Sequence, residues 1–128
     1  MGKSILVVDD TRAAAYVLGK LLETMGQRVR TAHDAVSALE SAQLERPDVV
    51  ISDIAMPNMD GYELARRLRR EPGLQGVVLV ALTGYGQDTD RQQAKEAGFD
   101  CYLVKPVSME DLHDLLAALP IPRKAAFA

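Results

Sequence analysis

The chain has one cysteine, two histidines and no long apolar run, and each of these shortages excludes a class of protein. Cys101 alone cannot form an internal disulfide, which is typical of a protein in a reducing cytoplasm. His33 and His113 stand far apart in the sequence, so we expect no zinc site built from cysteine and histidine. No segment approaches the roughly 20 apolar residues that span a bilayer, and no basic segment precedes a cleavable apolar stretch. We therefore expect a cytoplasmic protein with no membrane association.

An excess of basic residues is also missing. Fifteen Lys and Arg stand against eighteen Asp and Glu, for a net charge of -3. This balance argues against a direct nucleic-acid partner, which requires neutralisation of many phosphates. The 128 residues, 48% of them hydrophobic, suit one globular domain and leave no room for a two-lobed enzyme.

Five short apolar runs alternate with segments of helical period along the chain. That alternation predicts an α/β fold in which a parallel sheet is flanked by helices. The predicted strands are Ser4–Val8, Arg28–Ala32, Val49–Ser52, Val77–Leu82 and Cys101–Val104. The second run is the most polar, so we expect it at an edge of the sheet.

Apolar spacing, capping residues and stop signals locate four helices. They are a helix with an apolar stripe from Val17 to Met25, one that begins after Asp60, one over Asp88–Ala97, and one from Ser108 to Leu119. The third has a weak apolar face, so we expect it to pack loosely. We assign residues 1–119 to the domain and Pro120–Ala128, with two prolines, to a tail or linker.

A cysteine, a histidine and a group of arginines are interpreted without a role in a catalytic or metal site. Cys101, on the last strand, is interpreted as a small core residue, and His113 as a solvent-facing residue of the last helix. Four arginines close together in the second predicted helix are interpreted as a solvated face with some role in partner contacts. These are Arg66, Arg67, Arg69 and Arg70.

The polar residues that interrupt the apolar runs collect at the carboxyl ends of the predicted strands. Asp9 and Asp10 follow the first strand, Asp53 the third, Thr83 the fourth and Lys105 the fifth. Ligands of open, doubly wound α/β sheets bind outside these strand ends. The five side chains therefore form the candidate site.

Three carboxylates brought together repel one another unless a cation lies between them. Oxygen ligands without histidine or cysteine favour Mg²⁺, which also retains water and phosphate oxygens among its ligands. The Lys105 ammonium and the Thr83 hydroxyl supply a cation and a donor for phosphoryl oxygens, which phosphoryl transfer requires. Asp53, at the centre, can then act as the nucleophile.

Taken together, the motifs resemble the receiver domain of two-component response regulators over Lys3 to Leu119. The matching segments are LVVDD, VVISDIAMPNMDGYEL, VALTGY and AGFDCYLVKP, in this order. The segment LTGYGQDTDRQQAKEAGFDCYLVKP is similar to receivers of hybrid histidine kinases. The resemblance implies a flavodoxin-like (βα)5 fold with a doubly wound parallel sheet of strand order 2-1-3-4-5.

The resemblance also implies roles for individual residues. Asp53 would accept a phosphoryl group from a phosphohistidine of a histidine kinase or histidine phosphotransfer domain. Mg²⁺ would be bound directly by Asp10, Asp53 and the backbone carbonyl of Ala55, and through water by Asp9.

Phosphoryl oxygens would contact Thr83 and Lys105. Thr83 and the aromatic Tyr102 would switch the surface formed by the last two helices and the strand between them. The Lys105–Pro106 bond would be cis, which costs only about 0.5–1 kcal/mol before proline. The domain would be a signalling domain and not an enzyme, because it would catalyse only its own phosphorylation and slow dephosphorylation. It would be a monomer or a phosphorylation-dependent dimer.

Two positions depart from the family pattern. Thr11 stands where an asparagine is common, and Ala55 offers no side-chain amide, so the lifetime of the phosphoryl group stays open. A haloacid-dehalogenase-like phosphohydrolase is the alternative, but its nucleophile stands on the first strand in a D-x-D arrangement, and a cap domain does not fit this length. An FMN-binding flavodoxin module would meet repulsion between its phosphate and the Asp9–Asp10 pair.

Overall fold

The computed structural model describes residues 2–84 and 91–119 of the chain. Five strands alternate with five helices along these residues. The strands are β1 (Ser4–Val8), β2 (Arg28–Ala32), β3 (Val49–Asp53), β4 (Val78–Thr83) and β5 (Cys101–Val104). The helices are α1 (Arg12–Thr24), α2 (Ala35–Leu44), α3 (Gly61–Arg70), α4 (Arg91–Ala97) and α5 (Met109–Ala117).

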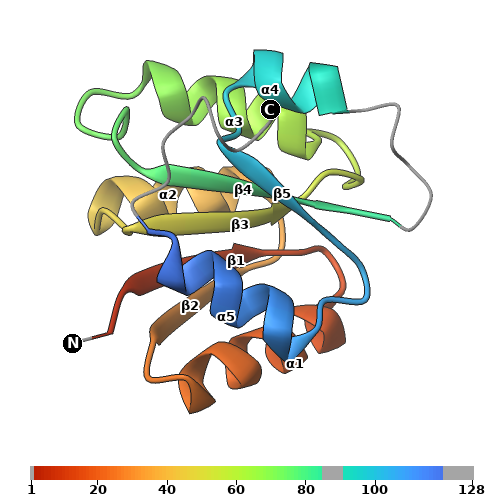
Figure 1. The fold of residues 1–128 in the computed structure, drawn as a ribbon. Helices are drawn as coiled ribbons and strands as arrows, with labels where there is room; N and C mark the ends of the chain where they lie inside the picture. Colours follow the sequence, from red (N-terminus) through yellow and green to blue (C-terminus); the bar gives the residue numbers. More distant parts are fainter. Residues whose placement is uncertain (1, 85–90, 120–128) are drawn as a thin grey trace.

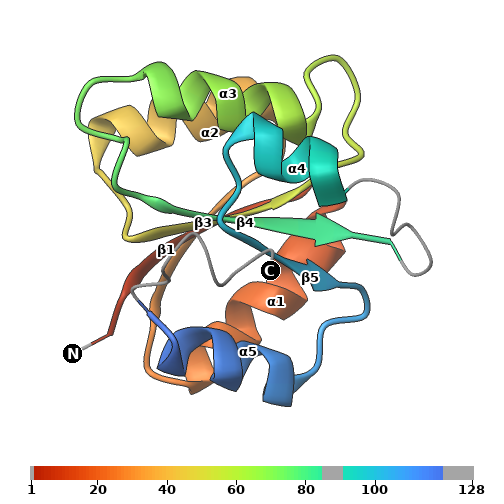
Figure 2. The ribbon, with the colours of Figure 1, turned by 45° about the horizontal axis from the view of Figure 1, so that its top comes forward.

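All strand pairs are parallel, and the sheet has the order β2-β1-β3-β4-β5, as predicted. Helices α1 and α5 cover one face, and α2, α3 and α4 cover the other (Figures 1 and 2). The polar strand β2 lies at the edge, and the four strands that carry the candidate residues are neighbours. The topology therefore brings the carboxyl ends of β1, β3, β4 and β5 to one end of the sheet.

Each face of the sheet has its own apolar core. Because successive side chains of a strand point to opposite faces, Ile5 and Val7 pack toward α1 and α5, whereas Leu6 and Val8 pack toward the other three helices. Leu22 of α1 is fully buried in the first core. This two-sided burial holds the central strands rigidly and fixes the positions of the residues that follow them.

The observed helices differ from the predicted ones at α1 and α2. α1 begins at Arg12, earlier than the apolar stripe indicates, and Val17 of that stripe is 57% exposed and not a core residue. α2 was not located by its pattern, because its buried residues are the small Ala35, Ala38 and Ala42, which give little apolar contrast. The predicted start of the third helix at Asp88 and the predicted tail, residues 120–128, lie outside the described residues.

The interpretation of the four arginines as one solvated face was wrong for Arg69. Arg66 and Arg67 do form exposed ion pairs with Glu63 on α3. The guanidinium of Arg69 instead forms a largely buried ion pair with Asp100, with 2.8 Å between Nη2 and Oδ2. Arg69 lies one helical turn after buried Ala65, at the margin of the apolar face, so its side chain turns toward the protein rather than the solvent.

The described residues contain no helix that is both long and apolar enough to cross a membrane. Cys101, interpreted from the sequence as a core residue, is only partly buried and packs against the core. Burial and the neighbouring Asp100 carboxylate raise the pKa of its thiol to about 12, so the thiol stays protonated at neutral pH.

Candidate functional site

The acidic pair Asp9 and Asp10 follows β1 directly. Asp9 is buried, and its carboxylate oxygen Oδ1 accepts a hydrogen bond from the backbone N–H of Thr11 at 2.9 Å. Its own backbone N–H donates to Ala32 at the end of β2, which fixes the turn into α1. Asp10 is exposed. The turn thus offers one rigid and one solvent-accessible carboxylate.

Asp53 is the last residue of β3, and its carboxylate is almost completely buried. The loop that follows returns to α3, where the N–H of Gly61 donates to the carbonyl of Ile54 at 2.9 Å. A Cβ on Gly61 would collide with the backbone of Asp53 and Ile54. Glycine is therefore required here for the loop to pack against the candidate acceptor.

Carboxylate oxygens of Asp9, Asp10 and Asp53 lie within 4.8 Å of one another. The ammonium Nζ of Lys105 lies 3.0 Å from Oδ2 of Asp53 and 3.7 Å from Oδ2 of Asp9. Lys105 follows β5, and its peptide bond to Pro106 is cis. Four of the five predicted side chains, from three strands, therefore form one cluster.

The fifth residue, Thr83, ends β4 beside the cluster. Leu82, which precedes it, is paired in register with Asp53. The Thr83 hydroxyl donates to the carbonyl of Leu103 on β5 at a long distance of 3.4 Å. In this structure the hydroxyl is therefore engaged with β5, the strand that also carries Tyr102.

The negative charges of the cluster's carboxylates are only partly neutralised by Lys105. Burial raises the pKa of Asp53, and the charge of Asp9 raises it further, against the opposing effect of Lys105 and of a hydrogen bond from the backbone of Ala55. For Lys105, burial lowers the pKa, but its contacts with Asp53 and Asp9 outweigh this and leave it raised. One lysine does not offset three carboxylates, so the site favours a further cation.

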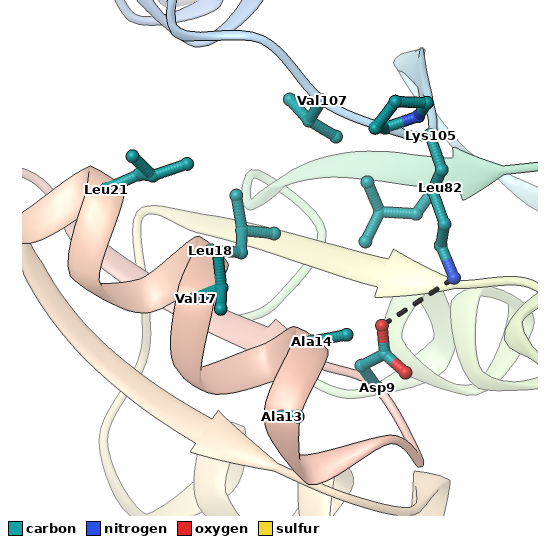
Figure 3. A pocket seen from close by; sticks show the side chains of 10 residues that line it. Asp9, Ala13, Ala14, Val17, Leu18, Leu21, Leu82, Lys105 and Val107 are labelled. Atoms are coloured by element: carbon teal, nitrogen blue, oxygen red, sulfur yellow. Dashed lines mark ion pairs between the residues drawn. The ribbon is translucent and has the colours of Figure 1, made fainter.

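An apolar groove of about 530 Å³ adjoins the cluster, between α1 and the segment after β5. Figure 3 shows Ala14, Val17 and Leu18 of α1 facing it, with the Lys105–Asp9 ion pair at one end. The small Ala13 and Ala14 leave this space beside the exposed Val17. The apolar pattern assigned Val17 to the helical stripe and did not indicate the groove, although the small Ala13 and Ala14 shortly after the acidic pair were a usable signal.

Comparisons with known proteins agree with this geometry. The family model described as the response regulator receiver domain matches residues 5–117. Response regulator MprA of Mycobacterium ulcerans is 39% identical over 119 residues, which are 93% of this chain and 50% of that protein. The chain thus spans about half the length of this relative.

Two solved structures are similar over nearly their whole length. Chemotaxis protein CheY4 of Vibrio cholerae has a TM-score of 0.87 and 32% identity, with 93% of this chain and 99% of that chain covered. The receiver domain of sensor histidine kinase PA1611 from Pseudomonas aeruginosa has a TM-score of 0.82 and 32% identity, covers 91% and 95% of the two chains, and holds a magnesium ion in its active-site cleft. With the strand order, the acidic cluster and the family model in agreement, the chain belongs to the response regulator receiver domains of two-component systems.

Proposed function

We propose that Asp53 accepts a phosphoryl group from a phosphohistidine of a histidine kinase or histidine phosphotransfer domain. The observation that carries this proposal is the position of Lys105, whose ammonium lies 3.0 Å from a buried carboxylate with two further carboxylates beside it. A purely structural ion pair would not require the additional negative charge of Asp9 and Asp10. The cytoplasm is the compartment we propose for this reaction.

The donor set suits Mg²⁺. Asp10 and Asp53, with the carbonyl of Ala55, would bind it directly, and Asp9 through water, since one Asp9 oxygen already accepts the Thr11 N–H. The related PA1611 receiver, which holds magnesium in its cleft, supports this assignment. When bound, Mg²⁺ neutralises the negative charge of the carboxylates and of the phosphoryl oxygens.

Phosphoryl transfer exchanges one bond to phosphorus for another. A carboxylate oxygen of Asp53 forms the new P–O bond while the P–N bond of the phosphohistidine breaks. The electron pair of that bond stays on the imidazole nitrogen, which takes a proton from water. Later attack of water on phosphorus releases inorganic phosphate and restores the Asp53 carboxylate, so the modification reverses slowly.

Lys105 and Thr83 would hold phosphoryl oxygens in this reaction. The ammonium of Lys105 already faces Asp53, whereas the Thr83 hydroxyl must leave the carbonyl of Leu103 to reach a phosphoryl oxygen. We propose that this movement, followed by Tyr102, changes the surface formed by α4, β5 and α5. No observation on residues 2–84 and 91–119 favours the phosphohydrolase alternative, since Asp53, which forms the shorter ion pair with Lys105, ends the third strand and not the first.

The apolar groove offers a place for the phosphodonor. A helix that carries the phosphohistidine can lay apolar side chains against Val17 and Leu21 while its phosphoryl group points to Asp53. The Lys105–Asp9 ion pair lies at one end of the groove, so that end of the groove opens onto the cluster. A small donor such as acetyl phosphate needs the cluster but not the groove.

Val17→Asp is expected to slow phosphorylation by a protein donor at least about tenfold, because a buried, unpaired charge at an interface costs more than 1.4 kcal/mol. Phosphorylation by acetyl phosphate should change little. Val36→Asp on α2 is the matched control, because Val36 is as exposed as Val17 (56% against 57%) but does not line the groove. Equal slowing by the two variants, in a rapid-quench assay with a phosphorylated histidine phosphotransfer domain, would contradict this docking site.

The proposed function itself is tested by labelling. Incubation with acetyl phosphate and Mg²⁺ should add about one phosphoryl group per chain, seen as a mass increase of the intact protein. The label should be removed by hydroxylamine, as an acyl phosphate is, and should not form when EDTA is present. A label that resists hydroxylamine would identify a phosphoester on a hydroxyl residue and refute the proposal.

A further inference from the structure

Helix α4 is attached to the rest of the protein very differently at its two ends. At its C-terminal end, the carbonyl of Gly98 accepts a hydrogen bond from Nε of Arg69 at 2.9 Å. The same guanidinium forms the ion pair with Asp100, whose carboxylate also accepts the backbone N–H of Leu79 on β4 at 2.8 Å. This end is therefore tied to both α3 and β4 by buried, charge-assisted bonds.

The other end of the described part of α4 has a weaker attachment. The guanidinium carbon of Arg91 lies 4.6 Å from the centroid of the Tyr102 ring, within the range of a cation–π contact. Arg91 is otherwise exposed. Between the two ends, α4 buries only the small side chains of Ala94 and Ala97. Little apolar contact therefore opposes a movement of this end.

Tyr102 lies where the proposed switch must act. It stands on β5, paired in register with Ala81 of β4, and is partly buried against the core beneath α4. Thr83 lies two residues further along β4 and bonds to Leu103, the neighbour of Tyr102. An inward turn of the Tyr102 ring would withdraw it from the guanidinium of Arg91.

We propose that the Arg91–Tyr102 contact is a latch that holds α4 in its resting position, and that α4 pivots about Gly98 when the latch opens. Gly98 suits a pivot because its backbone has a φ of 114°, which glycine adopts without strain, and because Arg69 anchors its carbonyl. The inference rests on the proposed function, since it assigns the residue that opposes the phosphorylation-driven switch. The pivot of α4 is a conformational change, and it involves no covalent bond at Asp53.

The latch must lower the affinity for every ligand that favours the switched state, because latch opening and ligand binding are linked equilibria. Beryllofluoride with Mg²⁺, which mimics a phosphoryl group on a carboxylate, is the probe. Arg91→Gln is expected to bind it about two- to fivefold more tightly than the parent, the range given by an exposed cation–π contact. Arg91→Lys keeps the charge but loses the planar stacking group, so its affinity for beryllofluoride should lie between those of the parent and Arg91→Gln.

The titration is followed by backbone amide NMR on the full chain. Lys95→Gln is the matched control, because it removes the same charge from the exposed side of α4 and should leave the affinity unchanged. In a Tyr102→Leu background, Arg91→Gln should have no further effect, which makes the coupling specific to this pair. Unchanged affinity in Arg91→Gln, or an equal gain in the Tyr102→Leu background, would overturn the latch.

A second readout is made on the ligand-free protein, with the beryllofluoride-bound parent as reference, and separates the latch from the proposed function. In the free protein, Arg91→Gln should move the Tyr102 ring resonances toward their beryllofluoride-bound positions. If the parent fails to bind beryllofluoride, the proposed function has failed and the latch with it. If the parent binds but Tyr102 does not respond to Arg91→Gln, only the latch is refuted.

Discussion

Asp53→Asn is expected to remove phosphorylation by acetyl phosphate and by protein donors altogether. The amide has nearly the same shape as the carboxylate but lacks the anionic oxygen that attacks phosphorus. Asp53 also contributes to the cluster that would hold Mg²⁺, so the variant loses both the nucleophile and a ligand. The intact mass should show about one phosphoryl group per chain for the parent and none for the variant.

The control for this experiment is Asp114→Asn, which removes a carboxylate from the exposed side of α5. It should be labelled as fully as the parent. Labelling of Asp53→Asn to the same extent would place the acceptor elsewhere and refute the assignment. Loss of labelling in both variants would show that the assay responds to net charge rather than to the acceptor.

The same substitution should make the metal-free protein more stable at neutral pH. Burial and the charge of Asp9 raise the pKa of Asp53 in the folded state, so its ionised form is less favourable there than in the unfolded chain. This penalty is fully present above the raised pKa and disappears as the pH falls below the ordinary value near 4. Urea midpoints in EDTA should therefore be higher for Asp53→Asn at pH 7 and converge with the parent in acid.

Mg²⁺ should reverse that order. A ligand that binds only the folded state at 100 times its dissociation constant stabilises it by about 2.7 kcal/mol. The parent is expected to gain this amount, and Asp53→Asn much less at the same concentration. A variant that gains as much as the parent would exclude Asp53 from the metal site.

The position of the cluster could be predicted because it follows from the ends of the strands. Asp9, Asp53 and Lys105 each stand directly after an apolar run, and parallel strands end at the same edge of the sheet. Their convergence therefore depends on topology and not on details of packing. The structure places the Lys105 ammonium within ion-pair distance of both Asp9 and Asp53, as that argument requires.

The features that escaped prediction depend on which side of a helix meets a neighbour. Val17 fits the apolar stripe of α1, but the space beside it stays open because Ala13 and Ala14 are small. α2 was missed for a related reason, since burying alanines produces almost no periodic contrast. Arg91 and Tyr102 carry no pairing signal in the sequence, because their contact joins a helix residue to a strand residue eleven positions later.

Arg69→Met should destabilise the protein by roughly 3 kcal/mol, the lower end of the cost of breaking a buried ion pair by removing one partner. The lower end applies because the Arg69 side chain retains 14% exposure, whereas that of Asp100 has only 5%. Besides the ion pair, Arg69 donates hydrogen bonds to the carbonyls of Gly98, Gln75 and Val77. Methionine keeps the apolar stem in place, so the loss reports the guanidinium rather than a cavity.

The carboxylate left behind accounts for most of this loss, and a second substitution separates it from the rest. In Arg69→Met combined with Asp100→Asn, no unpaired charge remains, and the neutral amide oxygen can still accept the N–H of Leu79. The double variant should therefore be more stable than Arg69→Met alone, with the difference read from urea midpoints at constant m-value. Arg70→Met, on the exposed side of the same turn, should stay within about 0.5 kcal/mol of the parent. If Arg69→Met behaves like Arg70→Met, the pair does not anchor α3 to the end of α4, and the pivot at Gly98 loses its support.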